Sequence, residues 1–430
     1  MKKKKLFADS YVDGRFKERQ LHGIGKNRHL ITLTRPVGYI KDESALPGST
    51  GEFSLDFISD VEVDTEEVRK TSKKINANDL IAEYYEDYFK ENGLTSERPS
   101  NVLNCFKSFD IDVYHKNKVK DIKRTNLCHD KFCINCQNMA SQLRFIKYKP
   151  ELDRLLKDYS IFHIVFTVPN CSDVMLSYTL QKMNDKFATL IRYFQCKKKI
   201  KGLDFSTFGF VGAVKSLEIV IHEKGFLSEF HPHFHCLFVL DKKFRDVGSH
   251  VNTYSHSKSE IKDDSHVKNG VRFFSDFDIM LQKIWYLLFN NIKVTKKAID
   301  ELELGYSVCA QRVITKYKDV FKYCMKGLFD PKTSRFMYSY KTFKTLYEAI
   351  HRKKIIQGYG ILNKFSFLTE EELEEHLSYY NEVITALRLE EDPELRHVKL
   401  QELVKDMENG EFKYISKKSV LSKKYKADKV

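Results

Sequence analysis

The segment HPHFHCLFVL, at residues 231–240, begins with three histidines at alternate positions and continues as an apolar run. Side chains alternate between the two faces of a strand, so His231, His233 and His235 share one face and the apolar residues take the other. Two imidazoles spaced i, i+2 on a buried strand can converge on one cation. The alternative is that the histidines are a polar rim with a structural role alone. Burying polar groups on an apolar strand costs free energy, however, unless they bind a partner or a ligand. We therefore expect a metal site on this strand.

A carboxylate on the preceding strand is the expected third ligand. The run SLEIVI at 216–221 predicts a strand that forms an antiparallel hairpin with 231–240. If the turn is centred between the two runs, Glu218 lies across from His233 to His235. Two histidines and a carboxylate bind a divalent ion while leaving positions open for substrate oxygens.

Two alternatives stay open at this site. In the first, Glu218 binds no metal and only pairs with a lysine on the neighbouring strand. In the second, His222, just beyond the strand, takes the place of Glu218 as the third ligand. His231, the first of the three histidines, lies outside the ligand set or contacts a phosphate.

The composition limits the class of protein. The chain has 430 residues, 42% of them hydrophobic and 31% charged, which suits two or three domains with large cores. Its 73 Lys and Arg against 59 Asp and Glu give a net charge of +14, which favours a polyanionic partner. No run of 18 apolar residues occurs, and no apolar segment follows the basic start Met1–Lys5, so we expect no membrane span and no signal peptide. The nine cysteines favour thiols and metal ligands over disulfides, and the cytoplasm is the expected compartment.

The chain from residue 155 to 365 alternates short apolar runs with amphipathic segments. Runs bounded by turn residues predict strands, and apolar residues three and four apart predict helices. The expected strands are about 161–168, 211–221, 231–240 and 306–314, and the expected helices are about 175–197, 276–290, 316–327 and 341–354. The stretch at 358–360 is expected to be irregular. Together they predict an α+β fold, a central antiparallel sheet with flanking helices and the histidine pair on a middle strand.

A tyrosine motif follows the expected sheet. In DVFKYCMKG, at 319–327, a helix would place Asp319, Tyr323 and Lys326 on one face. A tyrosine attacks phosphodiesters when a metal polarises the phosphate and a nearby cation favours the phenolate. The chain has 23 tyrosines, so the motif gains its meaning from the histidine strand upstream.

A cysteine cluster precedes the expected sheet. A CxxC pair with two more sulfurs makes a tetrahedral structural zinc site, and ordinary reduced thiols are the alternative. The candidate ligands are Cys105, Cys128, Cys133 and Cys136, with His129 adjacent. Arg124, Lys131 and Arg144 lie near them in the sequence, which predicts a DNA-facing surface on this module.

These motifs, in this order, resemble the rolling-circle replication initiators of small bacterial plasmids, which belong to the HUH endonuclease superfamily. The resemblance spans roughly residues 100–365 and rests on FTVPN, GAVKSLEIVI, HPHFHCLFVL, the helix around Trp285, DVFKYCMKG and HRKKIIQGYG. It implies Mg²⁺ or Mn²⁺ on His233 and His235 and a DNA-attacking tyrosine at Tyr323. Many members place a glutamate four residues before that tyrosine to end the replication cycle, and here Asp319, one methylene shorter, stands in its place.

The resemblance implies a site-specific enzyme that nicks and rejoins a single-stranded or hairpin origin. Tyr323 would form a 5′-phosphotyrosyl bond and free a 3′-hydroxyl for a host polymerase. The ion on His233, His235 and Glu218 would polarise the phosphate. Lys326 would offset developing charge, and Asp319 would activate water or help the closing transfer.

The sequence pattern and the resemblance together give the expected organisation and partners. Residues 1–99 are expected to be poorly ordered or peripheral, 100–150 a zinc-binding module, 155–365 an RRM-like HUH endonuclease domain, and 366–430 a basic helical tail. The expected partners are origin DNA and the host helicase and polymerase in the bacterial cytoplasm, with a second copy of the chain as a further candidate and no membrane.

Three other functions stay open. An HUH transposase or relaxase shares the chemistry, although no second tyrosine stands four residues after Tyr323, which argues against a two-tyrosine relaxase. A zinc protein that binds DNA without cleaving it is the second. A metallohydrolase is the third, and it would need further ligands at strand ends.

Overall fold

A computed structural model gives the fold. It describes residues 62–75, 77–224, 227–248, 250–251, 267–268, 271–313, 318–321, 336–363, 370–417 and 419. All of them lie in one unit, Asp56–Val430, of the two into which the chain divides. They form an α+β fold built on antiparallel sheets, as the sequence predicts. No helix in this described part is long and apolar enough to cross a membrane.

The larger sheet has the strand order β10-β3-β6-β5-β11, and β4 also pairs with β6. Its strands are β3 (Tyr159–Thr167), β4 (Cys171–Ser172), β5 (Gly212–Lys224), β6 (Leu227–Asp241), β10 (Val308–Val313) and β11 (Ile356–Gly360). All the pairings are antiparallel, and the histidine strand β6 lies between β3 and β5. The expectation of a middle strand for the histidines is therefore confirmed. The hairpin strands run further than the expected 211–221 and 231–240, since β5 continues to Lys224 and β6 begins at Leu227.

The stretch at 358–360 is a strand, so the expectation of an irregular segment is wrong. It belongs to β11, which pairs with β5 and sets Gly358 opposite Val214. A Cβ on Gly358 would lie 2.2 Å from the carbonyl oxygen of Leu362. The glycines of this stretch suggested an irregular segment, but their lack of a side chain lets the backbone of β11 lie close to that of Leu362.

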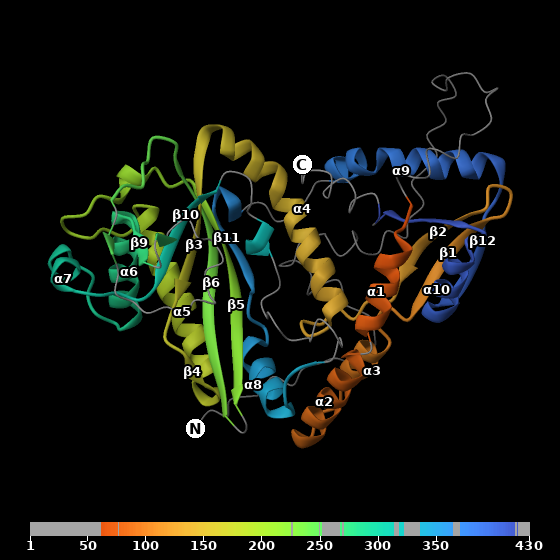
Figure 1. Cartoon of the computed structure of the whole chain (residues 1–430), viewed down its shortest axis with the longest axis horizontal. Helices are drawn as coiled ribbons and strands as arrows, with labels where there is room; N and C mark the ends of the chain where they lie inside the picture. Colours follow the sequence, from red (N-terminus) through yellow and green to blue (C-terminus); the bar gives the residue numbers. More distant parts are fainter. Residues whose placement is uncertain are drawn as a thin grey trace, which may run out of the picture. The chain divides into compact units, whose positions relative to one another are not determined.

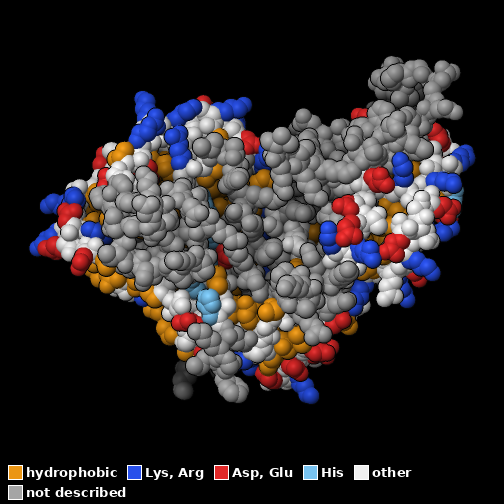
Figure 2. All heavy atoms as spheres, viewed as in Figure 1, with side chains coloured by type: hydrophobic (Ala, Val, Ile, Leu, Met, Phe, Trp, Pro, Cys, Tyr) orange, Lys and Arg blue, Asp and Glu red, His pale blue; other side chains and the backbone are white. Residues whose placement is uncertain are grey.

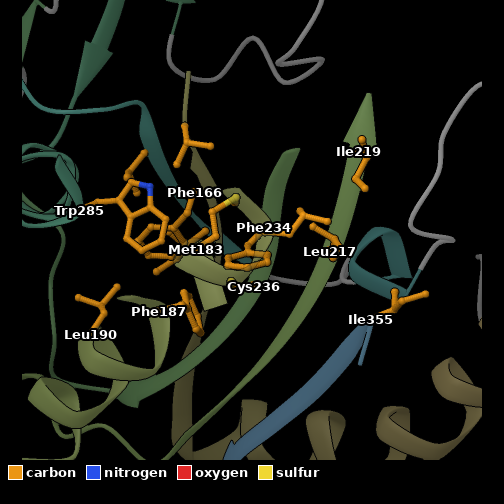
Figure 3. Close-up of a cluster of buried hydrophobic side chains, with 14 of the residues drawn as sticks. Phe166, Met183, Phe187, Leu190, Leu217, Ile219, Phe234, Cys236, Trp285 and Ile355 are labelled. Atoms are coloured by element: carbon orange, nitrogen blue, oxygen red, sulfur yellow. The ribbon is translucent and has the colours of Figure 1, made fainter. Parts of the chain in front are cut away.

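Helices cover both faces of the larger sheet. On one face lie α5 (Asp173–Phe194), α6 (Asp276–Phe289) and α8 (Tyr340–Ile350), and on the other lies α4 (Ile134–Asp158) (Figure 1). Figure 3 shows Phe234 and Cys236 of β6 packed among Met183 and Phe187 of α5 and Trp285 of α6. Burying one such large side chain stabilises the fold by about 1.5–3 kcal/mol. The apolar face of β6 therefore fixes which face the histidines take.

Helix α6 fixes the end of β3 beside the histidines. The indole Nε1 of Trp285 donates a hydrogen bond of 2.7 Å to the carbonyl of Thr167, the residue that pairs with His233. The buried carboxylate of Asp278 accepts a hydrogen bond of 2.6 Å from the backbone N–H of Ala310 in β10. The predicted helix around Trp285 is thus held to two strands of the sheet.

Several short elements connect these parts. They are η3 (Phe205–Phe208), β7 (His250–Val251), β8 (Val267–Lys268), β9 (Val271–Phe274), α7 (Lys296–Glu301), η5 (Lys318–Phe321) and η6 (Ile361–Asn363). Within the expected helix at 316–327, the described part is the 3₁₀ turn η5. The rest of that helix lies outside the described residues.

A second sheet joins the cysteine module to the C-terminal part of the chain. Its order is β12-β1-β2-β13, with β1 (Ser108–Tyr114), β2 (Val119–Thr125), β12 (Glu394–Lys399) and β13 (Lys413–Ile415). The neighbouring helices are α1 (Thr65–Ile75), α2 (Ala77–Glu91), α3 (Arg98–Leu103), α9 (Glu370–Glu390) and α10 (Leu400–Asn409). Of the N-terminal part, 1–61 lies outside the described residues.

The tail at 366–430, which we expected to be helical, holds the helices α9 and α10 and also contributes two strands to the second sheet. Strand β12 pairs with β1, and β13 runs parallel to β2. β12 is exposed along nearly its whole length, so it has no apolar alternation that a sequence pattern could detect. Only its pairing with β1 makes it a strand.

Helix α9 contacts the second sheet through a buried acid. The Tyr380 hydroxyl donates to both carboxylate oxygens of Asp121, at 2.9 and 2.8 Å. Asp121 is fully buried, and this burial raises the pKa of its carboxyl. Lys123 lies 3.4 Å from the same carboxylate. This contact anchors the C-terminal segment.

We expect Tyr380→Phe to lower the free energy of unfolding by about 1–3 kcal/mol, because it removes a hydroxyl donor from a buried carboxylate. Urea unfolding followed by circular dichroism measures the change. Tyr178→Phe is the matched control, since that side chain is 55% exposed, and it should change the free energy by less than about 0.5 kcal/mol. Equal losses in the two variants would contradict the anchoring role.

A lysine is buried in the larger core. Lys215 of β5 is 1% exposed, donates to the side-chain oxygen of Asn184, and places its Nζ 4.5 Å from the centroid of the Phe234 ring. Burial lowers the pKa of Lys215 from 10.5 to about 8. The folded chain therefore binds a proton at Lys215 less readily than the unfolded chain does.

This difference predicts how a Lys215→Met variant behaves with pH. Between pH 8 and 10.5 the unfolded wild type holds more protons, so its stability rises with pH, by about 3 kcal/mol in all. The methionine chain lacks this dependence. Its stability relative to wild type should fall by that amount across the interval, as measured by urea unfolding at several pH values. Lys297→Met, on an exposed helix, is the control, and a flat Lys215→Met difference would show that the lysine is not desolvated.

Candidate functional site

Three side chains converge on one face of the β5–β6 hairpin. The register pairs Glu218 with His233, as the sequence predicts for this hairpin. Oε2 of Glu218 lies 3.3 Å from Nε2 of His233 and 2.6 Å from Nε2 of His235. The candidate ligand atoms of the three residues lie within 4.8 Å of one another. Two imidazole nitrogens and one carboxylate can hold a divalent ion in this arrangement.

The ring nitrogens that face away from Glu218 have partners of their own. Nδ1 of His233 lies 3.3 Å from the carbonyl oxygen of His231, and Nδ1 of His235 lies 3.0 Å from Nε2 of His163 on β3. A metal-bound histidine uses its second ring nitrogen in this way, which fixes the ring orientation. The donor set therefore fits a metal ion.

The carboxylate of Glu218 is held in its charged form. Burial by itself raises its pKa, but the hydrogen bonds from His233 and His235 and their charges outweigh burial and bring the pKa well below its usual range. The side chains of Glu218, His233 and His235 are 14%, 11% and 20% exposed. The site is recessed but open to solvent, as a site for a large substrate must be.

The structure also locates the two other histidines of the hairpin. His231 touches His233 through its backbone carbonyl, and the two ring centroids are 5.3 Å apart. His222 pairs with Glu229 near the hairpin end, is exposed, and is not part of the converging group. Glu218 and His222 were the two candidates for the third ligand. The structure brings Glu218, and not His222, to His233 and His235.

The segment before Tyr323 lies on the same sheet face as this site. Phe321 of η5 shares a buried cluster with Leu237 and Val214, and its ring stacks on Tyr148 of α4 at 5.2 Å. Leu237 is two residues beyond His235, so both point to one face of β6.

The tyrosine motif itself is not described. Tyr323 and Lys326 lie outside the described residues, and for Asp319 the structure describes the backbone alone. Their catalytic roles stay predictions.

The four predicted cysteines form a second converging group. Sγ of Cys105 lies 3.5 Å from that of Cys136 and 3.6 Å from that of Cys133, and Sγ of Cys128 lies 3.6 Å from that of Cys136. These distances are far too long for disulfide bonds, which are about 2.05 Å. The four thiols can therefore hold one metal ion.

N–H groups surround these sulfurs. The backbone N–H of His129 donates to Sγ of Cys136 at 3.2 Å, and the side-chain amide of Asn78 on α2 donates to Sγ of Cys133 at 3.4 Å. Hydrogen bonds from Cys105, Cys128 and Cys136 lower the pKa of Cys133. Such donors stabilise thiolates, the form that binds a metal.

The cysteine loop packs against α8, so one prediction about its basic residues is wrong. Lys131 was expected on a DNA-facing surface, but its Nζ donates to the carbonyls of Ile350 and Lys353 at the end of α8, at 2.8 and 3.1 Å. Beside it, the buried Asp130 accepts from the Tyr85 hydroxyl at 2.9 Å. The last carbonyls of a helix lack partners within it, and Lys131 supplies one.

Two residues that sequence reasoning missed, His163 and Asn78, join the sites. His163 interrupts the apolar run IFHIVF, the same signal that singled out the histidines of β6. Asn78 lies on a separate helix and has no local signal, so only the tertiary structure brings it to the cysteines.

Comparison with known proteins identifies the hairpin region. Residues 119–254 match the Rep_1 family, described as a replication protein. No curated protein and no solved structure matches the chain. The matched stretch ends before Tyr323 and begins after Cys105. It holds Glu218, His233 and His235, so the converging site lies within the stretch that is similar to the Rep_1 replication-protein family, a family of plasmid rolling-circle replication initiators.

Proposed function

We propose that the protein initiates rolling-circle replication by nicking one strand of a plasmid origin through a 5′-phosphotyrosyl intermediate. Proteins of the Rep family are origin nickases. The observation that carries the proposal is the convergence of Glu218, His233 and His235 on one sheet face. An alternating histidine strand with a facing carboxylate is a donor set that can hold a divalent ion and leave positions open for phosphate oxygens.

The site residues would hold Mg²⁺ or Mn²⁺. The mixed nitrogen and oxygen donors suit Mn²⁺ well, because imidazole nitrogens are poorer ligands for Mg²⁺. Such an ion supplies positive charge to the non-bridging oxygens of the scissile phosphate. Glu218 keeps its negative charge in the recess. The contacts of Nδ1 of His233 with the His231 carbonyl, and of Nδ1 of His235 with His163, keep Nε2 of both rings pointed at Glu218.

Tyr323 is the proposed nucleophile. Its phenolic oxygen forms a bond to phosphorus while the bond from phosphorus to the 3′ oxygen breaks, and the released 3′-hydroxyl takes up a proton. The support is Phe321, two residues earlier in the sequence, which is buried on the sheet face that carries the candidate ligands. Lys326 offsets the charge that develops on the phosphate, and Asp319 accepts a proton or activates water in the closing transfer.

Labelled oligonucleotides from the DNA that flanks the coding sequence test the reaction. With Mn²⁺, a 3′-labelled strand should become covalently attached to the protein on a denaturing gel, and Tyr323→Phe should reduce the adduct at least about 100-fold. Tyr317→Phe, six residues earlier, is the control and should keep the adduct. An adduct that persists in Tyr323→Phe refutes the nucleophile, and binding without any cleavage supports a non-enzymatic DNA-binding protein.

The larger sheet and its helices form the proposed endonuclease domain, 155–365, in an RRM-like arrangement. The support is the central β6 flanked by β3 and β5, with helices on both faces. The proposed cysteine module, 100–150, would include the C-terminal strands β12 and β13. The N-terminal region 1–99 has no proposed role.

The proposed partner is origin DNA, with the host helicase and polymerase acting after the nick. The net charge of +14 favours a polyanion. Figure 2 shows lysine and arginine side chains gathered at the upper left of the face it presents, with acidic side chains scattered elsewhere. Such a surface suits contacts with phosphates.

Zinc is the proposed ion for the four thiols. With Zn–S bonds of about 2.3 Å, a regular tetrahedron has sulfur–sulfur edges of about 3.8 Å. The observed 3.5 and 3.6 Å approach this value, and the thiols of Cys105, Cys133 and Cys136 are buried, as in a closed structural site.

We expect the purified chain to retain one zinc ion, and Cys133→Ser to lose it. Removal should lower the melting temperature, because binding of a structural zinc contributes directly to folding. Metal analysis and thermal unfolding measure both effects. Cys196→Ser, at an exposed position outside the cluster, should change neither, and retention of zinc by Cys133→Ser would contradict the site.

A further inference from the structure

His163 contacts the proposed metal site from a neighbouring strand. It lies on β3, and its Nε2 is 3.0 Å from Nδ1 of His235. The two ring planes differ by only 16°, with centroids 5.2 Å apart. This is an edge-to-edge arrangement, in which one nitrogen donates its hydrogen to the lone pair of the other.

The strand register makes this contact specific. Val165 pairs with His235, and His163 pairs with Leu237, so His163 reaches His235 diagonally on the ligand face. His163 is not among the atoms that converge on Glu218. It therefore acts on the site through His235 and not as a ligand.

The effect of the contact between His163 and His235 depends on which ring nitrogen of His235 carries the hydrogen. A ring nitrogen binds a metal only with its lone pair, so an ion on Nε2 of a neutral His235 requires the hydrogen on Nδ1. That hydrogen then needs an acceptor, and the facing atom is Nε2 of His163. His233 meets the same requirement through the carbonyl of His231.

We propose that His163 is a positioning residue that accepts the Nδ1 hydrogen of His235 and so holds Nε2 of His235 in the form that binds the divalent ion. The inference rests on the proposed function and adds to it the residue that sets the affinity of the site. An ion held by Nε2 of His235 would require that nitrogen to release any hydrogen it carries to solvent, and His163 would then keep the remaining ring hydrogen on Nδ1.

Binding of Mn²⁺ to the full chain tests the proposal without any measurement of activity. Loss of Mn²⁺ from solution, followed by electron paramagnetic resonance, gives the dissociation constant. His163→Leu should weaken binding by about 10–100-fold, because it removes the acceptor. His163→Gln, whose amide oxygen can accept at about the position of Nε2, should bind within a few-fold of wild type.

A second readout separates positioning from folding. In chains labelled with ¹⁵N at histidine, saturating Mg²⁺ should fix the His235 signal in the Nδ1–H form in wild type and His163→Gln, and leave it mixed in His163→Leu. His397→Leu, at an exposed histidine of β12, is the matched control and should change neither readout.

The outcomes also distinguish this inference from the function on which it rests. Mn²⁺ binding that is unchanged in His163→Leu, or lost equally in His163→Gln, overturns the role of His163 and leaves the proposed function standing. Mn²⁺ binding that survives His233→Ala with His235→Ala overturns the metal site itself.

Discussion

The register of the β5–β6 hairpin is the constraint on which the rest of the site depends. A slip of one residue would move Glu218 to the opposite face of the sheet from the histidines. The apolar residues that alternate with the ligands fix this register, because Leu217 and Phe234 are buried against α5 and its neighbours. The core on one face thus positions the charged groups on the other.

The same rule explains how the sheet tolerates polar groups. Three charged groups on or beside the sheet have defined partners: Glu218 has two imidazoles, Asp278 has the backbone of β10, and Lys215 has an amide and an aromatic ring. An unpaired charge in these places would cost several kcal/mol. The pairing therefore specifies the arrangement of strands and helices more than it adds stability.

The cysteine module and the larger sheet are connected through side chains of the cysteine loop. Lys131 binds the end of α8, and Asp130 binds Tyr85 of α2, whose ring also packs edge-on against Tyr347 of α8. The module is thereby held to a helix that covers the core of the larger sheet. A metal ion on the four thiols would stabilise the loop that makes these contacts.

The elements that carry a local sequence pattern could be predicted before the structure was known. Apolar runs bounded by turn residues located β3, β5, β6 and β10, the spacing of apolar residues located α5 and α6, and the cysteine spacing located the thiol cluster. The hairpin also predicted Glu218, because an antiparallel pair joined by a short turn leaves little choice of register.

Only the tertiary structure decided the contacts between distant parts of the chain. His163 meets His235 because β3 pairs with β6, and Asn78 meets Cys133 because α2 packs on the cysteine loop. β12 and β11 are strands because β1 and β5 pair with them, although β12 is exposed and β11 is rich in glycine. Periodicity records which side of an element is buried, and it carries no information about which distant segment covers that side.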